Sequence, residues 1–440
     1  MQTSFTVEQR ADPDIRDAEN ILRACVHCGF CTATCPTYTL LGDELDSPRG
    51  RIYLIKDMLE NDKAASPVVV KHIDRCLSCL SCMTTCPSGV HYQHLVDHGR
   101  RHIEKTYTRP AAERTLRWFL GQVLSNPPLF RWAFVGTRAV RRLAALMPGR
   151  LRSLVDVMPD RLPPKSSLDG RRVFPAEGKT RARTALLTGC VQRVLNPAIN
   201  DATVRLLTRH GVEVVVAEGA GCCGALLHHL GEPEPSNRQA RQNIEAWWKQ
   251  TTDGGGAGLD AIIVNTSGCG TQIKDMGFHF RNDADWAGKA AAVSELARDV
   301  TEFLAEIGLQ EPVRPTGHTI TYHSACSMQH GQKITAQPIA LLSAAGFTVK
   351  TAKESHLCCG SAGVYNLLQP QLARRLRDRK AANLERTGAQ AIATGNIGCM
   401  TQLAGATAIP IVHTVELLDW ATGGPQPPAL AGLESVTFRQ

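Results

Sequence analysis

Short strand-like runs alternate with longer helical stretches in the C-terminal part of the chain. The runs "VEVVVAEG" and "FTVKTA" predict strands, whereas "RQARQNIEAWWKQ" and "QPQLARRLRDRKAANLE" have the spacing of amphipathic helices. This alternation is typical of an α/β fold with a mainly parallel sheet. Nearer the N-terminus, "SPRGRIYLIKDMLEND" predicts a helix that follows a turn at Pro48. We therefore expect an N-terminal α-helical domain followed by α/β units.

The strand and helix pattern occurs twice. "TALLTGC" ends at Cys190 and "TITYHSAC" ends at Cys326, and each predicts a strand that ends on a cysteine. A "CCG" triplet follows in both copies, and the separation from Cys190 to Cys222 equals that from Cys326 to Cys358, at 32 positions. Further on, "AIIVNTSGCGTQ" matches "AIATGNIGCMTQ". The sequence thus predicts an internal duplication of a long unit, with its cysteines at strand ends, where parallel sheets place ligands.

Composition is that of a globular protein, because 43% of the 440 residues are hydrophobic and 20% are charged. The N-terminus has no apolar signal-like stretch, so we expect no secretory signal. The longest charge-free run, 388–415, contains many polar residues and predicts a buried strand–helix unit instead of a membrane span. In a reducing cytosol, sixteen clustered cysteines favour metal binding or redox chemistry over disulfides.

The basic charge is concentrated in one segment. Residues 100–183 contain 19 Lys and Arg against 6 Asp and Glu, within a chain of net charge +8. Arginines at 138, 141 and 142 fall on one predicted helical face, and aromatic residues add apolar surface nearby. Such a segment can rest on an anionic bilayer, pack on a partner subunit or bridge two domains, and the sequence leaves these three open. Nucleic acid is disfavoured, because no recognised binding module accompanies the charge.

Eight cysteines near the N-terminus form two runs of four. "CVHCGFCTATCP" and "CLSCLSCMTTCP" both have the C-x2-C-x2-C-x3-C-P spacing of ferredoxins that hold two cubane iron–sulfur clusters. Two-residue gaps let a short loop offer three thiolates to one cluster, and the fourth cysteine serves the other cluster. The first cluster is assigned to Cys25, Cys28, Cys31 and Cys86. The second is assigned to Cys76, Cys79, Cys82 and Cys35.

Structural zinc is the alternative for these eight cysteines. Zinc sites usually have two separated C-x2-C pairs, whereas here two contiguous runs are followed by Pro36 and Pro87, which favours two [4Fe–4S] clusters. Arg49 and Arg51 lie in the insert between the runs. They either place positive charge near a cluster or are ordinary surface arginines, and the sequence does not choose between these interpretations.

The other eight cysteines belong to the duplicated units. They are Cys190, Cys222, Cys223 and Cys269 in the first copy, and Cys326, Cys358, Cys359 and Cys399 in the second. Four matched cysteines per copy favour a further metal or iron–sulfur centre over reduced core thiols. We expect Gly224 and Gly360 to let the backbone approach whatever the paired thiols hold. The neighbouring histidines are interpreted as core or supporting residues, not as ligands: His228, His229, His323 and His356.

No sequence motif for hydride or nucleotide chemistry accompanies the cysteines. The chain has no G-x-G-x-x-G after a strand, no phosphate-binding loop of the Walker type and no G-x-S-x-G elbow. A chain rich in electron carriers without such a site predicts one subunit of a dehydrogenase, with the substrate chemistry on a flavin in another chain.

The chain resembles the iron–sulfur subunits of bacterial glycolate oxidase over essentially its full length. The resemblance rests on "ILRACVHCGFCTATCPTYTLLGDELDSPRGRIYLIK", "CPSGVHY", "GCCGA", "TSGCG", "SHLCCGSAG" and "NIGC". It implies a complex with two flavoprotein-type subunits that carry FAD and oxidise glycolate to glyoxylate, with D-lactate as a second substrate. It also implies electron transfer to a membrane quinone or another non-oxygen acceptor, and a cytoplasmic location on the inner face of the inner membrane.

One departure concerns the duplicated units. Heterodisulfide reductase relatives end each such motif with C-x-x-C, whereas this chain has single cysteines in "TSGCG" and "NIGCM". A four-cysteine centre, a centre shared between the copies and no centre therefore stay open. The alternative functions are the iron–sulfur subunit of a lactate, glycerol 3-phosphate or disulfide oxidoreductase, and a zinc-bound assembly scaffold.

The expected organisation has five parts. They are a ferredoxin-like helical domain at 1–108, a basic connector at 109–183, CCG domains at 184–312 and 313–425, and a tail at 426–440.

Overall fold

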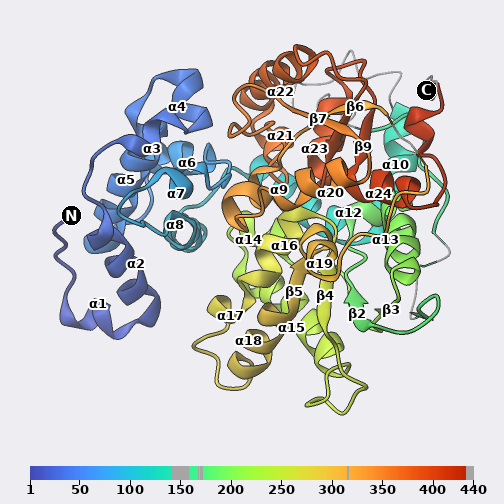
Figure 1. The fold of residues 1–440 in the computed structure, drawn as a ribbon. Helices are drawn as coiled ribbons and strands as arrows, with labels where there is room; N and C mark the ends of the chain where they lie inside the picture. Colours follow the sequence, from blue (N-terminus) through green and yellow to red (C-terminus); the bar gives the residue numbers. More distant parts are fainter. Residues whose placement is uncertain (141–157, 167, 169–171, 315–316, 433–440) are drawn as a thin grey trace.

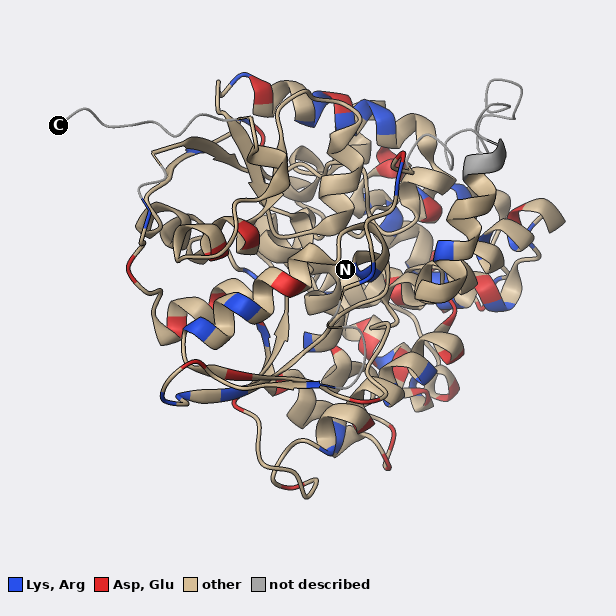
Figure 2. Cartoon of the chain, turned by 90° about the vertical axis from the view of Figure 1, so that its right-hand side faces the viewer, with Lys and Arg blue, Asp and Glu red and all other residues tan. Residues whose placement is uncertain are grey.

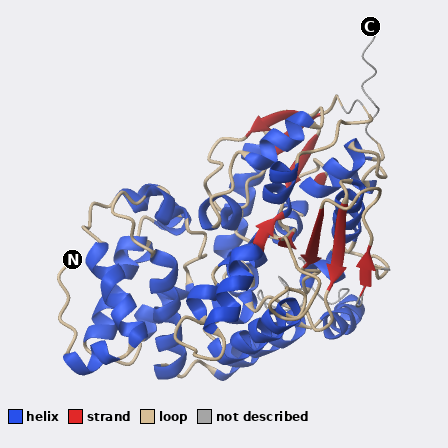
Figure 3. Cartoon of the chain, turned by 60° about the horizontal axis from the view of Figure 1, so that its bottom comes forward, coloured by secondary structure: helices blue, strands red, loops and turns tan. Residues whose placement is uncertain are grey.

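The computed structural model describes residues 1–140, 158–166, 168, 172–314 and 317–432, with the side chains of 138–140 excepted. Its N-terminal part is helical and stands beside two α/β units, as Figures 1 and 3 show. The N-terminal elements are α1 (Val7–Ala11), α2 (Pro13–Ala24), α3 (Phe30–Ala33), α4 (Pro36–Leu41), η1 (Glu44–Asp46), α5 (Pro48–Glu60), α6 (Pro67–Asp74), α7 (Ser81–Thr85) and α8 (Tyr92–Thr106).

Helix α5 confirms the helix predicted after Pro48. Ser47 caps it by accepting a hydrogen bond from the Gly50 amide at 2.9 Å, and Pro48 occupies the first turn, where its missing N–H costs nothing. Gly50 is required here, because a Cβ atom at this position would lie 2.0 Å from the carbonyl oxygen of Glu44 in η1. The close approach holds η1 against α5.

The duplicated units each build a sheet. The first has the strand order β1-β3-β2-β4-β5 and is parallel except for β1, which pairs antiparallel with β3; the second is wholly parallel in the order β7-β6-β8-β9. The predicted α/β class is thereby confirmed. The strands are β1 (Arg172–Phe174), β2 (Ala182–Leu186), β3 (Val212–Val216), β4 (Ala261–Val264), β5 (Ala297–Asp299), β6 (Thr319–Tyr322), β7 (Thr348–Thr351), β8 (Ala391–Thr394) and β9 (Ile411–His413).

Helices alternate with these strands. In the first unit they are α12 (Val191–Leu195), α13 (Ala198–Arg209), α14 (Ala225–His229), α15 (Pro233–Trp248), α16 (Ser267–Lys274), α17 (Met276–His279), α18 (Ala287–Leu296) and α19 (Val300–Ile307). In the second they are the π-helical turn η3 (Ser327–Gly331), α20 (Gln337–Ala344), α21 (Tyr365–Leu368), α22 (Pro370–Glu385), α23 (Ile397–Ala404), α24 (Thr414–Ala421) and the 3₁₀ turn η4 (Pro428–Leu430). Strands β2 and β6 end four residues before Cys190 and Cys326, so these cysteines lie in the following loops and not on the strands.

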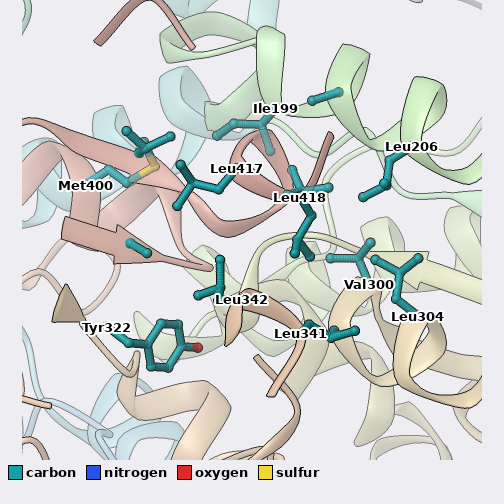
Figure 4. Packing of buried hydrophobic residues seen from close by; sticks show 14 of the residues in the cluster. Ile199, Leu206, Val300, Leu304, Tyr322, Leu341, Leu342, Met400, Leu417 and Leu418 are labelled. Carbon is teal, nitrogen blue, oxygen red and sulfur yellow. The ribbon is translucent and has the colours of Figure 1, made fainter. Parts of the chain in front are cut away.

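The two α/β units share one hydrophobic core. Figure 4 shows Ile199 and Leu206 of the first unit close to Leu417 and Leu418 of the second. The side chain of Asp419, 1% exposed, accepts ion pairs from Arg205 at 2.6 Å and from Arg209 at 2.8 Å across this boundary. Burial of apolar surface stabilises a fold by about 25 cal/mol per Å². This shared core is therefore the main interaction that holds the two units together. The two units are therefore fixed relative to each other.

A helical hairpin follows the N-terminal helices. It consists of α9 (Ala111–Ser125) and α10 (Pro127–Val140), and its inner face buries Leu120, Leu124 and Phe130 against α12 and α14. Part of the predicted basic charge is used internally, since Arg109 and Arg117 both pair with Asp74. Over the whole side of the molecule that Figure 2 shows, Lys and Arg are interspersed with Asp and Glu.

The predicted connector contributes more than the hairpin, because β1 and the start of β2 belong to the first sheet. The domain boundaries at 1–108, 109–183, 184–312, 313–425 and 426–440 stay a prediction. Arg141 and Arg142 lie outside the described residues, and the side chain of Arg138 is not described either. Within the described part of the chain, no helix is long and apolar enough to cross a membrane.

Candidate functional site

The two N-terminal cysteine runs have the same unusual backbone. In the first, His27 and Gly29 have φ of 56° and 81°, and at the matching positions of the second, Ser78 and Leu80 have φ of 48° and 61°. Left-handed conformations are costly for residues other than glycine and are retained mainly at functional sites. Alternating conformations of this kind turn successive N–H groups towards a concave surface, which suits an anionic iron–sulfur group.

The first predicted ligand set surrounds one cavity. Cys25, Cys28, Cys31 and Cys86 line a cavity of about 430 Å³, and Cys82 lines its wall. Burial raises the pKa of the Cys31 thiol to about 11, so a soft metal that displaces the proton is the natural partner for this thiol. The donor set, four convergent thiols in a concave loop, fits a cubane iron–sulfur cluster.

The second predicted set also converges. Burial raises the pKa of Cys82, and the nearby thiols of Cys79, Cys76, Cys35 and Cys31 raise it further. The hydroxyl of Tyr92 donates to Cys76 Sγ at 3.7 Å. Hydrogen bonds to cluster sulfurs are among the features that set a cluster potential, so Tyr92 belongs to this site although the sequence did not indicate it.

Arg51 supplies a buried positive charge beside the second set. Its side chain is 1% exposed, and its Nη1 lies 3.9 Å from Cys35 Sγ. Its Nε donates to the carbonyl oxygen of His72 at 2.7 Å, and its Nη2 lies 3.4 Å from Asp46 Oδ1. Of the two interpretations left open for Arg51, charge near a cluster site is the one that the geometry supports. Arg49 is one-third exposed and pairs with Glu44 at 2.7 Å, although its Nη1 also reaches the carbonyl oxygen of His27 at 3.4 Å.

All eight cysteines of the duplicated units line a single cavity, which we call the thiol cavity. Its volume is about 1100 Å³, and Cys79 of the N-terminal part also lines it. The residues come from loops at the carboxyl ends of β2, β3, β6 and β7 and from the first turns of α16 and α23, where parallel sheets place ligands. Its cysteines are Cys190, Cys222, Cys223, Cys269, Cys326, Cys358, Cys359 and Cys399. The two copies thus face each other across one space.

Within each copy the four thiols contact one another in sequence order. The contacts of the first copy run Cys190–Cys222–Cys223–Cys269. Those of the second run Cys326–Cys358–Cys359–Cys399, with 3.5 Å between the Sγ atoms of the last pair. All sixteen cysteines of the chain are free, so none of these contacts is a disulfide. Buried reduced thiols in such groups are a donor set for a soft metal.

The glycines after the paired cysteines lie between the thiols and the following helix. Gly224 and Gly360 have φ of 89° and 87°, so the left-handed turn itself requires glycine. A Cβ atom would lie 2.9 Å from the carbonyl oxygen of Ser236 in α15, and 2.5 Å from that of Ala373 in α22. A side chain would therefore collide with the following helix, and the Gly360 amide also donates to Cys358 Sγ at 3.4 Å.

The second copy carries two titratable side chains where the matching positions of the first copy have none. A ring nitrogen of His323 and the sulfurs of Cys359 and Cys399 lie within 4.8 Å of one another, and His323 Nε2 is buried without a hydrogen-bond partner. Lys380 is 2% exposed and donates to the carbonyl oxygen of Glu354 at 2.6 Å. It faces all four thiols of the second copy. The matching residues of the first copy are Leu187 and Asn243.

The predicted histidines have diverse positions. His323 is buried, as its interpretation as a core residue predicts, and it also lies close to two thiols, whereas His229 lines the thiol cavity. His228 points to Asp97, with its Nε2 2.9 Å from Oδ2, and the backbone carbonyl of His356 contacts His330 at 3.1 Å. Asp97 and Lys380 were missed, because nothing in their local sequence indicates burial beside a site.

Three groups of thiols, two of them in left-handed loops, define an iron–sulfur protein of the electron-transfer class. Known families agree with this class: the 4Fe-4S dicluster domain matches residues 21–90, and the cysteine-rich CCG domain matches 184–274 and 320–404. The glycolate oxidase iron-sulfur subunit of Escherichia coli is 44% identical over 96% of this chain and 99% of its own length.

Other relatives are more distant. The probable glycolate oxidase iron-sulfur subunit of Bacillus subtilis is 31% identical over 88% of this chain and 89% of its own length. Lactate utilization protein A of the same organism is 25% identical over 54% of this chain and 99% of its own length. The chain belongs to the family of glycolate oxidase iron-sulfur subunits.

Proposed function

We propose that this chain is the iron–sulfur electron-transfer subunit of a glycolate oxidase complex. The observation that carries the proposal is the unbroken succession of thiol groups through the molecule. It begins at Cys28, which is exposed, continues through Cys82 in the wall of the first cavity, and reaches the thiol cavity at Cys79. Nearly full-length similarity to two glycolate oxidase iron-sulfur subunits supports it.

In this proposal the N-terminal residues hold two [4Fe–4S] clusters, which supply one-electron transfer. Cys25, Cys28, Cys31 and Cys86 hold the first, and Cys76, Cys79, Cys82 and Cys35 hold the second. Arg51 offsets negative charge beside Cys35, and Tyr92 donates to Cys76. The loops with left-handed residues hold the thiols in place before a cluster binds, so little conformational entropy is lost when the cluster is inserted.

The remaining steps of the reaction belong to other chains in this proposal. Two flavoprotein-type subunits carry FAD and oxidise glycolate to glyoxylate, with D-lactate as a second substrate. A membrane quinone or another non-oxygen acceptor receives the electrons. The support is the family membership and the absence from the sequence of a nucleotide-binding motif. If the assembled complex reduced a dye with lactate and not with glycolate, lactate would replace glycolate as the assigned substrate.

Iron content tests how many of the thiol groups are used. We expect anaerobically purified protein to contain clearly more than about eight irons per chain, the number that two [4Fe–4S] clusters need. The reason is that nine thiols converge on the thiol cavity. The measurement is iron and acid-labile sulfide per chain, with EPR spectra after dithionite reduction.

About eight irons would restrict the clusters to the N-terminal part and make the thiol cavity a structural remnant. Zinc without iron or sulfide would overturn the electron-transfer proposal and support an assembly scaffold.

The outer face of the α9–α10 hairpin is proposed as the surface that contacts an anionic membrane. Trp118 and Trp132 are 63% and 76% exposed, and Phe119, Leu129 and Val135 are exposed beside them in sequence. Aromatic rings suit the headgroup layer of a bilayer, and the surrounding segment is rich in arginine.

Replacing both tryptophans should weaken membrane binding. We expect Trp118→Ser with Trp132→Ser to remove most of the protein from sedimented phosphatidylglycerol vesicles, because two exposed anchors are lost without a change in the core. The matched control is Val173→Ser, which removes a half-exposed apolar side chain from β1. Unchanged sedimentation of the double variant would leave the hairpin as a subunit contact or a bridge between domains.

A further inference from the structure

A row of ionisable side chains crosses the boundary between α8 and the first α/β unit. From the surface inwards, the rings of His91 and His94 stack at 3.9 Å, and His94 Nε2 lies 3.0 Å from Asp275 Oδ1. Asp275 Oδ2 lies 3.2 Å from His279 Nε2, and the ring of His279 meets that of His228 at 4.5 Å. Asp275 thus joins His94 and His279 directly, whereas the imidazole pairs lie ring against ring and need water between their nitrogens to pass a proton.

The row continues to the thiol cavity. The Nε2 atom of His228 lies 2.9 Å from Asp97 Oδ2, and its ring is 5.8 Å from that of His229. His229 lines the thiol cavity beside the cysteines. We call the seven residues the histidine row: His91, His94, Asp275, His279, His228, Asp97 and His229.

A polar cavity accompanies the middle of the row. It has a volume of about 420 Å³ and is lined by His94, Asp97, His228 and His279 together with His98. Asp97 and His98 are 5% and 6% exposed, and Asp97 Oδ1 and His98 Nε2 lack a hydrogen-bond partner in the protein. Buried polar atoms of this kind are normally satisfied by ordered water. Water in this space would join the imidazole rings that do not touch.

The outer end of the row meets solvent. His91 is exposed, and His91 and Asp275 line a surface pocket of about 890 Å³. Protons from bulk water therefore have access to one end of the row, and the thiol cavity lies at the other.

His229 is poised to accept a proton when negative charge arrives beside it. Burial lowers its pKa to about 3, so the ring is neutral at physiological pH. Arg100 and Asp97 of α8, His228 of its own helix and His279 of α17 face it, and the cysteines line the cavity beyond. An added electron in a cavity of low dielectric raises the proton affinity of a neighbouring imidazole strongly.

We propose that the histidine row conducts protons to the thiol cavity, so that one proton enters His229 for each electron that reaches a metal centre bound there. The electron comes from the substrate oxidised by the partner subunits, and the proton comes from bulk water through His91. Charge is balanced, because one positive charge accompanies one negative charge. The inference rests on the proposed function and adds to it the coupling of proton uptake to electron transfer.

The test is the pH dependence of the cluster potentials in the complete, anaerobically purified protein, from about pH 6 to pH 8.5, around the usual histidine range. EPR-monitored redox titrations should show one centre whose potential falls by about 59 mV per pH unit, the value for one proton per electron. His229→Gln, which keeps a polar side chain without a titrating ring, should remove this slope. The matched control is His102→Gln, since His102 lies on α8 outside the row and its ring Nε2 bonds to the carbonyl of Lys63 at 2.8 Å.

A second variant guards against misfolding of the first. His91 is exposed, so His91→Gln leaves the core unchanged. It should keep the slope but slow the proton uptake that an indicator dye reports after rapid reduction.

A pH-independent potential in the natural protein, or a slope that persists in His229→Gln, would overturn the proposal. So would iron analysis that finds no centre in the thiol cavity. Glycolate-dependent dye reduction measured on the same preparation separates the two proposals: if it is present without a pH-dependent potential, the histidine row alone fails.

Discussion

Replacing Cys79 by Ala is expected to reduce glycolate-dependent dye reduction by the assembled complex to the background of the assay. Cys79 is assigned to the second N-terminal cluster, yet it also lines the thiol cavity and packs with Cys326 and Cys358. It is therefore the thiol through which the N-terminal part meets the duplicated units. A ligand lost at this junction interrupts transfer in both directions.

The measurement is dye reduction with an acceptor that takes electrons only from the iron–sulfur chain, together with EPR of the reduced complex. The control is Ser88→Ala, because Ser88 lines the first cavity without offering a thiol. A dye that accepts directly from the flavoprotein subunits should still be reduced by the Cys79→Ala complex. Full activity of this variant with the first dye would show that the proposed succession of thiols is not the obligatory route.

The second large effect is expected at Arg51. Arg51→Met should lower the free energy of unfolding of the N-terminal part by about 3–5 kcal/mol, the usual result of removing one partner from a buried ion pair. The cause is that Asp46, fully buried, loses one of its two arginine partners and keeps only Arg75 at 2.7 Å, and that the His72 carbonyl and Thr37 hydroxyl lose a donor. The lost positive charge beside Cys35 should also make the second cluster harder to reduce.

Arg49→Met is the matched control, since Arg49 stands two positions away and pairs with Glu44 at the surface. An exposed pair contributes at most about 1 kcal/mol, so this variant should unfold close to the natural protein. Unfolding is followed in urea by circular dichroism and by bleaching of the iron–sulfur absorbance under anaerobic conditions. Equal unfolding midpoints for the two variants would contradict the role assigned to the buried network.

Local signals in the sequence predicted the elements well, because strands, helices and cysteine runs are short-range patterns. The helix after Pro48 and the repeated strands appear as expected, and matched backbone conformations accompany the two N-terminal runs. The contact of Cys79 with the thiol cavity was not predictable, because it depends on how the N-terminal helices dock on loops about 250 residues further along the chain. The burial of Arg51 was equally hidden, since neighbouring arginines look alike in sequence and only packing separates them.

The thiol cavity between two similar halves has a consequence for the ancestry of the chain. Two copies with matching strand orders, β3-β2-β4-β5 and β7-β6-β8-β9, that line one cavity resemble two subunits of a homodimer that share a site at their interface. In a homodimer every substitution appears on both sides of the interface. Once the halves are joined in one polypeptide, each can diverge alone, and His323 and Lys380 stand opposite Leu187 and Asn243 as the result. Fusion thereby permits a cavity whose two halves carry different titratable residues, so that its electrostatic potential is asymmetric. A homodimer of identical chains could not maintain this difference.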